Sequence, residues 1–188
     1  MGSIDKAEVR RLAAAMGLRT ASKPDSQDVC FITSTGGRET FLGERIPFRA
    51  ARVVDTDGTE LGSVPSVELV TIGQRRGLGI AVGEPRYVVD IDPKDRTVVV
   101  GTYEELLVDG CTVSGVSFTS GSAPETAEVT VKVRYRSKAV GAALQPSGDD
   151  WEVVFDEPHP APAPGQAAVF YDGDRVLGGG TITGVIRA

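Results

Sequence analysis

Short apolar runs separated by turns rich in glycine and proline make up most of this chain, and only its N-terminal stretch has helical spacing. The apolar positions of that stretch recur at i, i+3, i+4 and i+7 and are Val9, Leu12, Ala13 and Met16. The spacing predicts one amphipathic helix, with Asp5 and Glu8 as a capping pair at its start and Gly17 at its end. A lone helix of this length must bury its apolar stripe against another surface.

Residues 21–107 are expected to form a small β-rich domain. Cys30 lies in it where a polar loop enters an apolar run of strand type, residues 29–32. The dipeptide Asp57-Gly58 predicts a tight hairpin, because both central positions of such a turn can take positive φ. The other elements expected are a strand over 67–72, a glycine-rich loop over 73–79 and a second hairpin formed by 87–91 and 97–100.

The pattern restarts near Val108 as a series of six short strands. They are expected at 112–118, 128–136, 139–145, 151–155, 167–171 and 175–185, mostly with glycine or proline between them. Six strands at this spacing suit a small closed barrel, since closure removes exposed strand edges. The predicted fold class is therefore mainly β, with an N-terminal helix, a central β-rich domain and a barrel over residues 108–188.

Composition narrows the class of protein. With 40% hydrophobic and 24% charged residues, and no apolar run near the roughly 20 residues of a membrane helix, we expect a soluble protein with no membrane partner. The charged N-terminus lacks the apolar core of an export signal, which favours a cytoplasmic location. Two cysteines and one histidine argue against a bound metal. The net charge of −6 argues against a protein that coats nucleic acid, although local basic patches are compatible with it.

The two cysteines differ in their sequence surroundings. A thiol at a loop-to-strand junction, such as Cys30, is accessible to substrate, and its chemistry needs the thiolate. Lys23 would lower the pKa of that thiol, whereas Asp25 and Asp28 would oppose this. The residues alone favour a structural, buried Cys30, and they favour this more strongly for Cys111. A disulfide between the two is open in principle, although intracellular proteins seldom keep such bonds.

Two cationic features are candidates for contacts with phosphate. The first is a row of cations at alternate positions of one predicted strand, which would project from one face of it: Lys132, Arg134, Arg136 and Lys138. Such a row suits either a phosphate track or a solvated face of a sheet, and the pattern does not decide between them. The second is the loop over 73–79, in which Gln74, Arg75 and Arg76 could bind phosphate or a base edge. The loop lacks the Gly-Lys-Ser/Thr ending of a Walker loop, and a solvated turn explains it equally well.

Taken in order, these segments resemble the tRNA-specific 2-thiouridylase family, the sulfurtransferases that thiolate the wobble uridine of certain tRNAs. The matching segments are KAEVR at 6–10 with the glycine at 17, KPDSQDVCFI at 23–32, TIGQRRGLGI at 71–80, RYR at 134–136 and PGQAAVFY at 164–171. The resemblance covers essentially the whole chain. It implies that residues 1–20 are the closing helix of an ATP-binding domain absent from this chain, that 21–107 carry a catalytic cysteine, and that the barrel over 108–188 resembles the second domain of elongation factors and docks the tRNA anticodon region.

The resemblance also implies a mechanism. The absent domain would use ATP to adenylate the uridine oxygen, and Cys30 would carry the sulfur as a persulfide received from a cysteine desulfurase or a sulfur-donor relay. A cysteine of the absent domain would then close a transient disulfide with Cys30. The residues implied to contact tRNA are Arg134, Tyr135 and Gln166, with Lys132 and Arg136 beside them and Gln74 and Arg75 as further contacts from the central loop. No metal is implied.

Departures from the family pattern leave alternatives open. Val64, Ser66 and Val70 stand in a stretch where the family shows a histidine, a glycine and an aromatic residue, which puts the conformation of the neighbouring 73–79 loop in question. Without an ATP-binding domain the chain alone is expected to be inactive. The competing interpretations are a non-catalytic RNA-binding β protein in which Cys30 is structural, and a degenerate copy with no activity.

Overall fold

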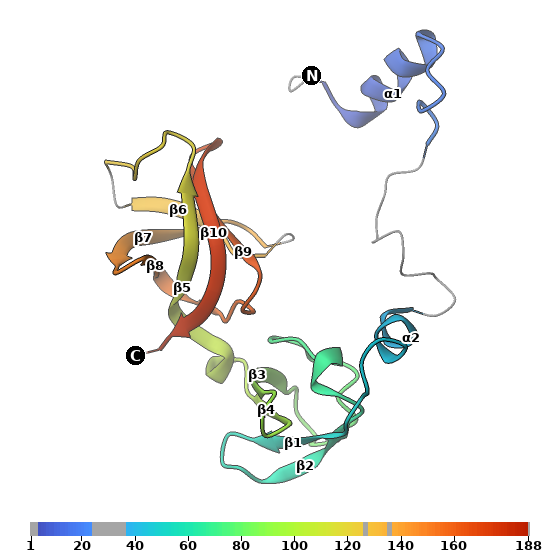
Figure 1. Cartoon of the computed structure of the whole chain (residues 1–188), viewed down its shortest axis with the longest axis vertical. Coiled ribbons are helices and arrows are strands. Elements are labelled where there is room, and N and C mark those ends of the chain that lie inside the picture. The colour runs from blue at the N-terminus through green and yellow to red at the C-terminus, as the bar shows by residue number, and fades with distance from the viewer. Residues whose placement is uncertain (1–3, 24–36, 126–127, 135–136, 188) are drawn as a thin grey trace. The chain divides into compact units, whose positions relative to one another are not determined.

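A computed structural model describes residues 4–23, 37–125, 128–134 and 137–187 (Figure 1). The chain divides into two compact units, Met1–Pro47 and Phe48–Ala188, and each is described by itself. None of the helices in the described ranges is long and apolar enough to cross a membrane.

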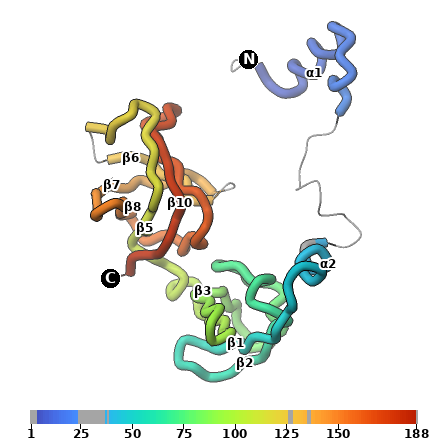
Figure 2. Tube along the Cα trace, in the orientation of Figure 1, coloured from blue at the N-terminus to red at the C-terminus, as the bar shows by residue number. Residues whose placement is uncertain are grey.

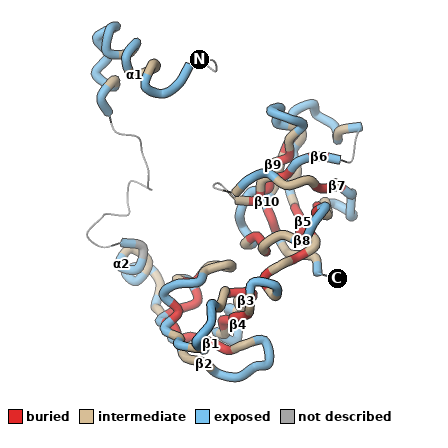
Figure 3. Tube along the Cα trace, turned by 180° about the vertical axis from the view of Figure 1, so that it is seen from behind, coloured by how far each residue is buried: buried red, intermediate tan, exposed pale blue. Residues whose placement is uncertain are grey.

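The first unit contains the predicted helix and one that was not predicted. Helix α1 spans Lys6–Ala15, and the Asp5 carboxylate accepts the backbone N–H of Glu8 at 2.8 Å, so Asp5 is confirmed as the cap. The Glu8 carboxylate accepts hydrogen bonds from the guanidinium of Arg11. Helix α2, Gly37–Gly43, is too short for a periodic pattern to reveal it. No described residue of this unit is buried, as Figure 3 shows, and Met16 is 74% exposed.

The second unit begins with a four-stranded sheet. Its strands are β1 (Ala51–Asp55), β2 (Glu60–Val64), β3 (Tyr87–Asp92) and β4 (Thr97–Gly101). They lie in the order β2-β1-β4-β3, with β1 and β4 parallel and the other pairs antiparallel. Both predicted hairpins are confirmed. The turn between β1 and β2 differs in detail, because Gly58 has positive φ and Asp57 does not; the Asp55 carboxylate instead accepts the backbone N–H groups of Asp57 and Thr59.

The strand predicted over residues 67–72 is wrong. A short 3₁₀ helix, η1 (Val67–Leu69), lies there, followed by irregular backbone. Val67 and Val70 lie three residues apart and both enter the core of the sheet, which explains an apolar run that mimics a buried strand. The segment then lies against β3, since the Gly73 N–H donates to Val88 O and the Val88 N–H donates to Gln74 O.

A closed six-stranded barrel follows the short helix η2 (Glu104–Leu106), and it confirms the predicted fold class (Figure 2). Its strands are β5 (Leu107–Phe118), β6 (Glu128–Lys132), β7 (Val140–Ser147), β8 (Asp150–Pro160), β9 (Ala167–Asp172) and β10 (Arg175–Ile186). Neighbouring strands are antiparallel in the order β10-β5-β8-β7-β6-β9, and β9 pairs with β10 to close the barrel. Phe170 and Ile182 are fully buried inside it.

One strand boundary matters for the site. The strand predicted to reach Arg136 ends at Lys132, so the prediction that four cations share one strand is wrong. Beyond Lys132 the chain turns, and both the backbone N–H and the hydroxyl of Ser137 donate to the carbonyl of Arg134. This turn moves Arg134 out of the sheet, and Arg136 lies outside the described residues.

Candidate nucleic-acid interface

A cavity of about 620 Å³ gathers several of the predicted tRNA contacts. Lys132 enters it from the end of β6, Arg134 from the turn that follows, and Gln166 from the segment before β9. Strands β6 and β9 are paired here, with Lys132 opposite Val169 and Thr130 opposite Tyr171. The described residues that line it are Thr71, Ile72, Lys132, Arg134, Ala163, Gln166, Ala167, Val169 and Tyr171.

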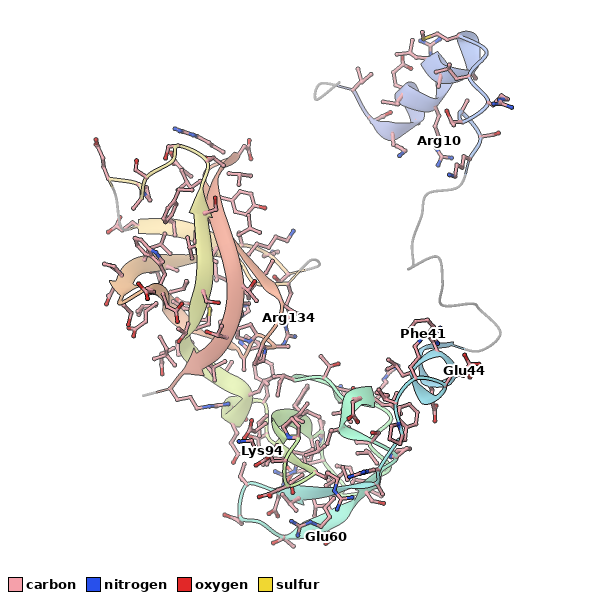
Figure 4. All side chains as sticks on the ribbon, in the orientation of Figure 1. Arg10, Phe41, Glu44, Glu60, Lys94 and Arg134 are labelled. Carbon is pink, nitrogen blue, oxygen red and sulfur yellow. The ribbon has the colours of Figure 1, made fainter. Side chains whose placement is uncertain are left out.

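Arg134 is the most constrained cation of this cavity. Its side chain is half-buried, and the guanidinium Nη2 donates to the carbonyl of Ala161 at 2.6 Å and to that of Ile72 at 3.4 Å. Desolvation by burial lowers its pKa. The guanidinium also lies against the backbone of Gly73, where an added Cβ would come within 3.0 Å of Nη2. Figure 4 labels Arg134 at the end of the barrel nearest the sheet.

Lys132 and Gln166 are held by backbone geometry and keep their polar ends available. The Gln166 N–H donates to Ala163 O, and Gln166 O accepts the N–H of Ile182, which fixes the segment before β9 on β10. Gln166 is exposed and Lys132 half-buried. Within the part of the chain that the structure describes, neither side chain has a hydrogen bond or ion pair. Tyr135 and Arg136, the other predicted contacts of this segment, lie outside the described residues.

Tyr171 lines the same cavity but was not singled out from the sequence as a site residue. One signal for it in the sequence is its place at the end of the 164–171 segment that resembles the family. The alternation on β9 could have found it, because Ala168 and Phe170 are buried while Val169 and Tyr171 point to the other side. A half-buried tyrosine beside cations offers both a ring and a hydroxyl to a ligand.

The central loop over residues 73–79 is held together by Gln74. Its side-chain oxygen accepts the N–H of Thr71 at 3.1 Å, and its side-chain nitrogen donates to the carbonyl of Arg76 at 2.9 Å. Arg75 and Arg76 are exposed. Arg75 lines a separate cavity of about 400 Å³ together with Arg86, so it does not share the cavity that holds Gln166. The side-chain amide of Gln74 is occupied by hydrogen bonds within the loop, and Arg75 and Arg76 are the exposed cations of the loop.

The three positions that depart from the family pattern lie in the core beneath this loop. Val64 and Val70 belong to the core of the sheet, and Ser66 is 1% exposed with its hydroxyl donating to the carboxylate of Glu68. Small side chains at these positions therefore fill the space with their polar groups satisfied, and the 73–79 loop is formed above them.

Of the two cysteines, the structure describes Cys111. Cys111 on β5 is completely buried and unpaired, and burial raises the pKa of its thiol to about 12. The expectation that Cys111 is structural agrees with this position. Cys30 lies outside the described residues. Among the residues that can be placed, no group of three His, Cys, Asp or Glu side chains has the arrangement of a metal site.

Comparison with known proteins gives a consistent result along the chain. The tRNA methyl transferase HUP domain matches residues 1–34, the tRNA methyl transferase PRC-barrel domain matches 39–102, and the aminomethyltransferase β-barrel domain matches 108–182. These matches place the chain in a class of tRNA-modification proteins.

Full-length relatives then identify the family. Proteins named tRNA-specific 2-thiouridylase MnmA are 45% identical over 100% of this chain in Synechococcus sp., 47% over 97% in Picosynechococcus sp. and 45% over 97% in Trichormus variabilis. The chain belongs to the tRNA-specific 2-thiouridylase family, of which it contains the central and C-terminal portions. It spans about half the length of these relatives, 52–53% of each.

Proposed function

We propose that this chain supplies the sulfur-carrying and tRNA-docking portions of an enzyme that 2-thiolates the wobble uridine of tRNA. The observation that carries the proposal is the cavity where Lys132, Arg134 and Gln166 converge on one end of the barrel. In this division of labour residues 21–107 carry sulfur and residues 108–188 dock tRNA. Action on tRNA would take place in the cytoplasm.

The chemistry of the cavity supports RNA as its ligand. In a chain of net charge −6, a cavity that gathers an ammonium, a guanidinium, an amide and a phenol concentrates positive charge where the molecule as a whole repels phosphate. The Lys132 ammonium suits a phosphate oxygen, and the Gln166 amide can pair with a base edge or ribose hydroxyl. The Tyr171 ring offers a surface on which an unstacked base can lie.

Sulfur transfer would proceed through a persulfide on Cys30. The Cys30 thiolate attacks the sulfane sulfur of a donor persulfide, so that one S–S bond forms as another breaks and the donor leaves as a thiolate. The terminal sulfur then attacks C2 of the adenylated uridine, and AMP leaves with the former uridine oxygen. A second cysteine attacks the remaining S–S bond, releasing the thiolated base and closing a disulfide with Cys30. An external thiol reductant then restores both cysteines.

Cys111 is a poor alternative as the carrier, which supports assigning the role to Cys30. A thiol with a pKa of about 12 is almost entirely protonated at neutral pH, and only the thiolate attacks sulfur. Cys111 also has no exposed surface through which a donor protein or a tRNA could reach it. Its surroundings are the apolar interior of the barrel.

ATP-dependent activation needs residues beyond these 188. The sequence has no Gly-Lys-Ser/Thr phosphate loop, and the mechanism requires a second reactive cysteine that Cys111 cannot supply. We therefore propose that ATP and the second cysteine are held by the part of the enzyme corresponding to the other half of its relatives. The 188 residues alone should bind tRNA and accept sulfur without producing thiolated tRNA.

Persulfide transfer from a cysteine desulfurase and its relay proteins tests the carrier role. Incubation with ³⁵S-labelled cysteine should label the wild-type chain and the Cys111→Ala variant but not the Cys30→Ser variant, and peptide mass spectrometry should locate the label on Cys30. Labelling that survives in Cys30→Ser, or that disappears only in Cys111→Ala, would contradict the assignment.

A second candidate is a non-catalytic RNA-binding protein in which Cys30 is structural. The observation that favours it is that the described lining of the cationic cavity already supplies an ammonium, a guanidinium and an amide, from Lys132, Arg134 and Gln166. In this case Lys132→Ala weakens tRNA binding and lowers its salt dependence, while Cys30→Ser changes neither tRNA binding nor sulfur uptake. The persulfide experiment separates the two candidates, because both predict the same effect of Lys132→Ala.

A further inference from the structure

We propose that Arg134 is a positioning residue that fastens the central loop of the sheet to the barrel, and so holds the docking cavity in shape for RNA. This inference deepens the proposed tRNA-docking function and rests on it for its consequence in RNA binding. It differs from the role implied by family resemblance, in which Arg134 contacts tRNA directly. The structural part of the inference can be tested without RNA.

The bonding of the guanidinium supports this role. Its Nη2 bridges two carbonyls that are far apart in sequence, that of Ala161 at 2.6 Å, just after β8, and that of Ile72 at 3.4 Å, in the segment leading to the central loop. Gly73 supplies the space, because any larger residue would place its Cβ 3.0 Å from Nη2 and 3.1 Å from Nη1. Two motifs that are separate in the sequence, TIGQRRG and RYR, therefore meet at one contact.

The surroundings explain why such a contact is needed. In the described residues no strand of the four-stranded sheet pairs with a strand of the barrel, and a cavity of about 1170 Å³ is lined by residues of both. A second arginine bridges at this cavity. Arg187 donates to the carbonyls of Glu105 at 3.0 Å, Leu107 at 3.3 Å and Val89 at 3.4 Å. Sheet and barrel are thus joined by charged hydrogen bonds to backbone carbonyls, which are stronger than neutral ones, in addition to the apolar packing of Val89 and Ile72 against the barrel core.

The same geometry separates Arg134 from its neighbours in the cavity. A guanidinium already bonded to two carbonyls and partly desolvated can offer a phosphate only its remaining donors, whereas the polar ends of Lys132 and Gln166 have no partner in the described residues. Lysine should not replace arginine in this role, because it substitutes a single ammonium on a flexible stem for the planar guanidinium that lies against Gly73 and so holds the two carbonyls less firmly. The Arg134→Lys variant should therefore lose the contact although it keeps the positive charge.

Hydrogen exchange of the full chain without RNA tests the contact directly. The reporter amides are those of Gly73, Val88 and Ala161, which are hydrogen-bonded beside the contact. In both Arg134→Ala and Arg134→Lys these amides should exchange roughly tenfold faster or more, because a charged hydrogen bond is lost on each side. Arg175→Ala, which removes an exposed arginine at the β9–β10 turn, is the charge-matched control and should leave them unchanged. Unchanged exchange in Arg134→Ala, or restored protection in Arg134→Lys, would overturn the inference.

Binding of unmodified tRNA over a range of salt concentrations tests the consequence. Arg134→Ala should lower the affinity for tRNA roughly tenfold and leave the slope of log K against log salt unchanged. Lys132→Ala should instead reduce the magnitude of that slope by about one, the value expected for the loss of one phosphate contact. A slope reduced by about one in Arg134→Ala, with normal amide exchange, would show a direct phosphate contact and refute the positioning role. If the wild-type chain binds no tRNA, the docking function fails, and the exchange experiment still decides whether Arg134 fastens the loop.

Discussion

Gly73 and Gly58 share a positive φ but differ in what surrounds them. Gly73 has φ +78° and lies against the Arg134 guanidinium, whereas Gly58 has φ +85° and nothing within 4 Å of an added Cβ. Gly58→Ala should therefore cost only the backbone strain of about 1 kcal/mol. Gly73→Ala should cost about 1 kcal/mol more in the free energy of unfolding, because the guanidinium must shift away from the added methyl group and its hydrogen bonds to the two carbonyls weaken.

Chemical denaturation of both variants measures this difference, and a double-mutant cycle assigns it. If the extra cost of Gly73→Ala comes from Arg134, it should disappear when Arg134 is already alanine. Equal costs for the two glycine variants would show that the contact contributes nothing to stability.

Cys111 gives the chain a dependence on alkaline pH. Its pKa is about 12 in the folded state, against an ordinary value of 9.0, so between these values the folded state retains a proton that the unfolded state has lost. Unfolding then releases a proton, and stability falls as pH rises, by at most about 1.4 kcal/mol per pH unit. The effect is absent below pH 9. Denaturation at pH 8 and pH 10.5 should show a smaller loss in Cys111→Ala than in the wild-type chain, and equal losses would contradict a buried protonated thiol.

The surroundings of Arg134 could be predicted from the sequence only in part. Its charge, its place beyond β6 and its proximity to other cations could be read from the chain. Its acceptors could not, since Ile72 lies 62 residues away and Ala161 lies 27 residues away. Contacts of backbone carbonyls leave no pattern of residue types, because every residue carries a carbonyl.

At the scale of the element, the central loop depends on one side chain. Gln74 connects the N–H of Thr71 to the carbonyl of Arg76, and Gln74→Ala removes both hydrogen bonds. We expect a loss of about 1–2 kcal/mol in stability and faster amide exchange at Thr71. Gln74→Glu is the sharper variant, because it keeps an acceptor for Thr71 but turns the donor for Arg76 into a second acceptor.

Arg75→Ala is the control for this prediction. It removes a neighbouring exposed cation that has no hydrogen bond within the described residues, and it should leave stability within about 0.5 kcal/mol of wild type. If Gln74→Ala is equally neutral for stability but weakens tRNA binding, the amide contacts RNA as family resemblance implies, and the loop does not depend on it.

Most strands could be predicted because their burial alternates or their turns are marked. Strand β9 has alternating buried positions, and the Asp92 carboxylate accepts the N–H groups of Lys94 and Asp95 in the turn between β3 and β4. The strand predicted over residues 67–72 is wrong because a short apolar run, here Val67, Val70 and Ile72, is as compatible with a 3₁₀ turn as with a strand. The predicted end of β6 is wrong because the chain leaves the sheet at Val133. This residue remains buried, so the alternation of apolar and polar residues continues in the sequence beyond the end of the strand.

At the scale of the molecule, the cores predict which part of the chain folds alone. Every residue of the two apolar cores lies between Ala51 and Ile182, and no described residue of 1–47 is buried. A chain of residues 48–188 should therefore unfold cooperatively with a midpoint within a few degrees of the full chain, measured by circular dichroism. A large drop in the midpoint would mean that residues 1–47 contribute packing that the cores do not show.

The docking cavity was only partly predictable at this scale. Lys132, Arg134 and Gln166 were each singled out by type and by family resemblance, but their meeting depends on the pairing of β6 with β9, two strands that are not consecutive in the chain. The participation of Thr71 and Ile72 depends on how the sheet lies against the barrel end within the second unit. Hydrophobic periodicity specifies the faces of strands and carries no information about which distant loop covers the end of a barrel.

The two proposed roles, tRNA docking and sulfur carriage, should separate when the chain is divided between residues 47 and 48. Because every described residue that lines the cavity with Lys132, Arg134 and Gln166 lies within residues 48–188, that shorter chain should bind tRNA with an affinity within about threefold of the full chain and an equal salt slope. It lacks Cys30, and its remaining thiol, Cys111, is buried and protonated, so it should accept no sulfur from the desulfurase relay. Loss of tRNA binding in the shorter chain would assign part of the docking surface to residues 1–47, and sulfur uptake by it would remove the reason for assigning the persulfide to Cys30.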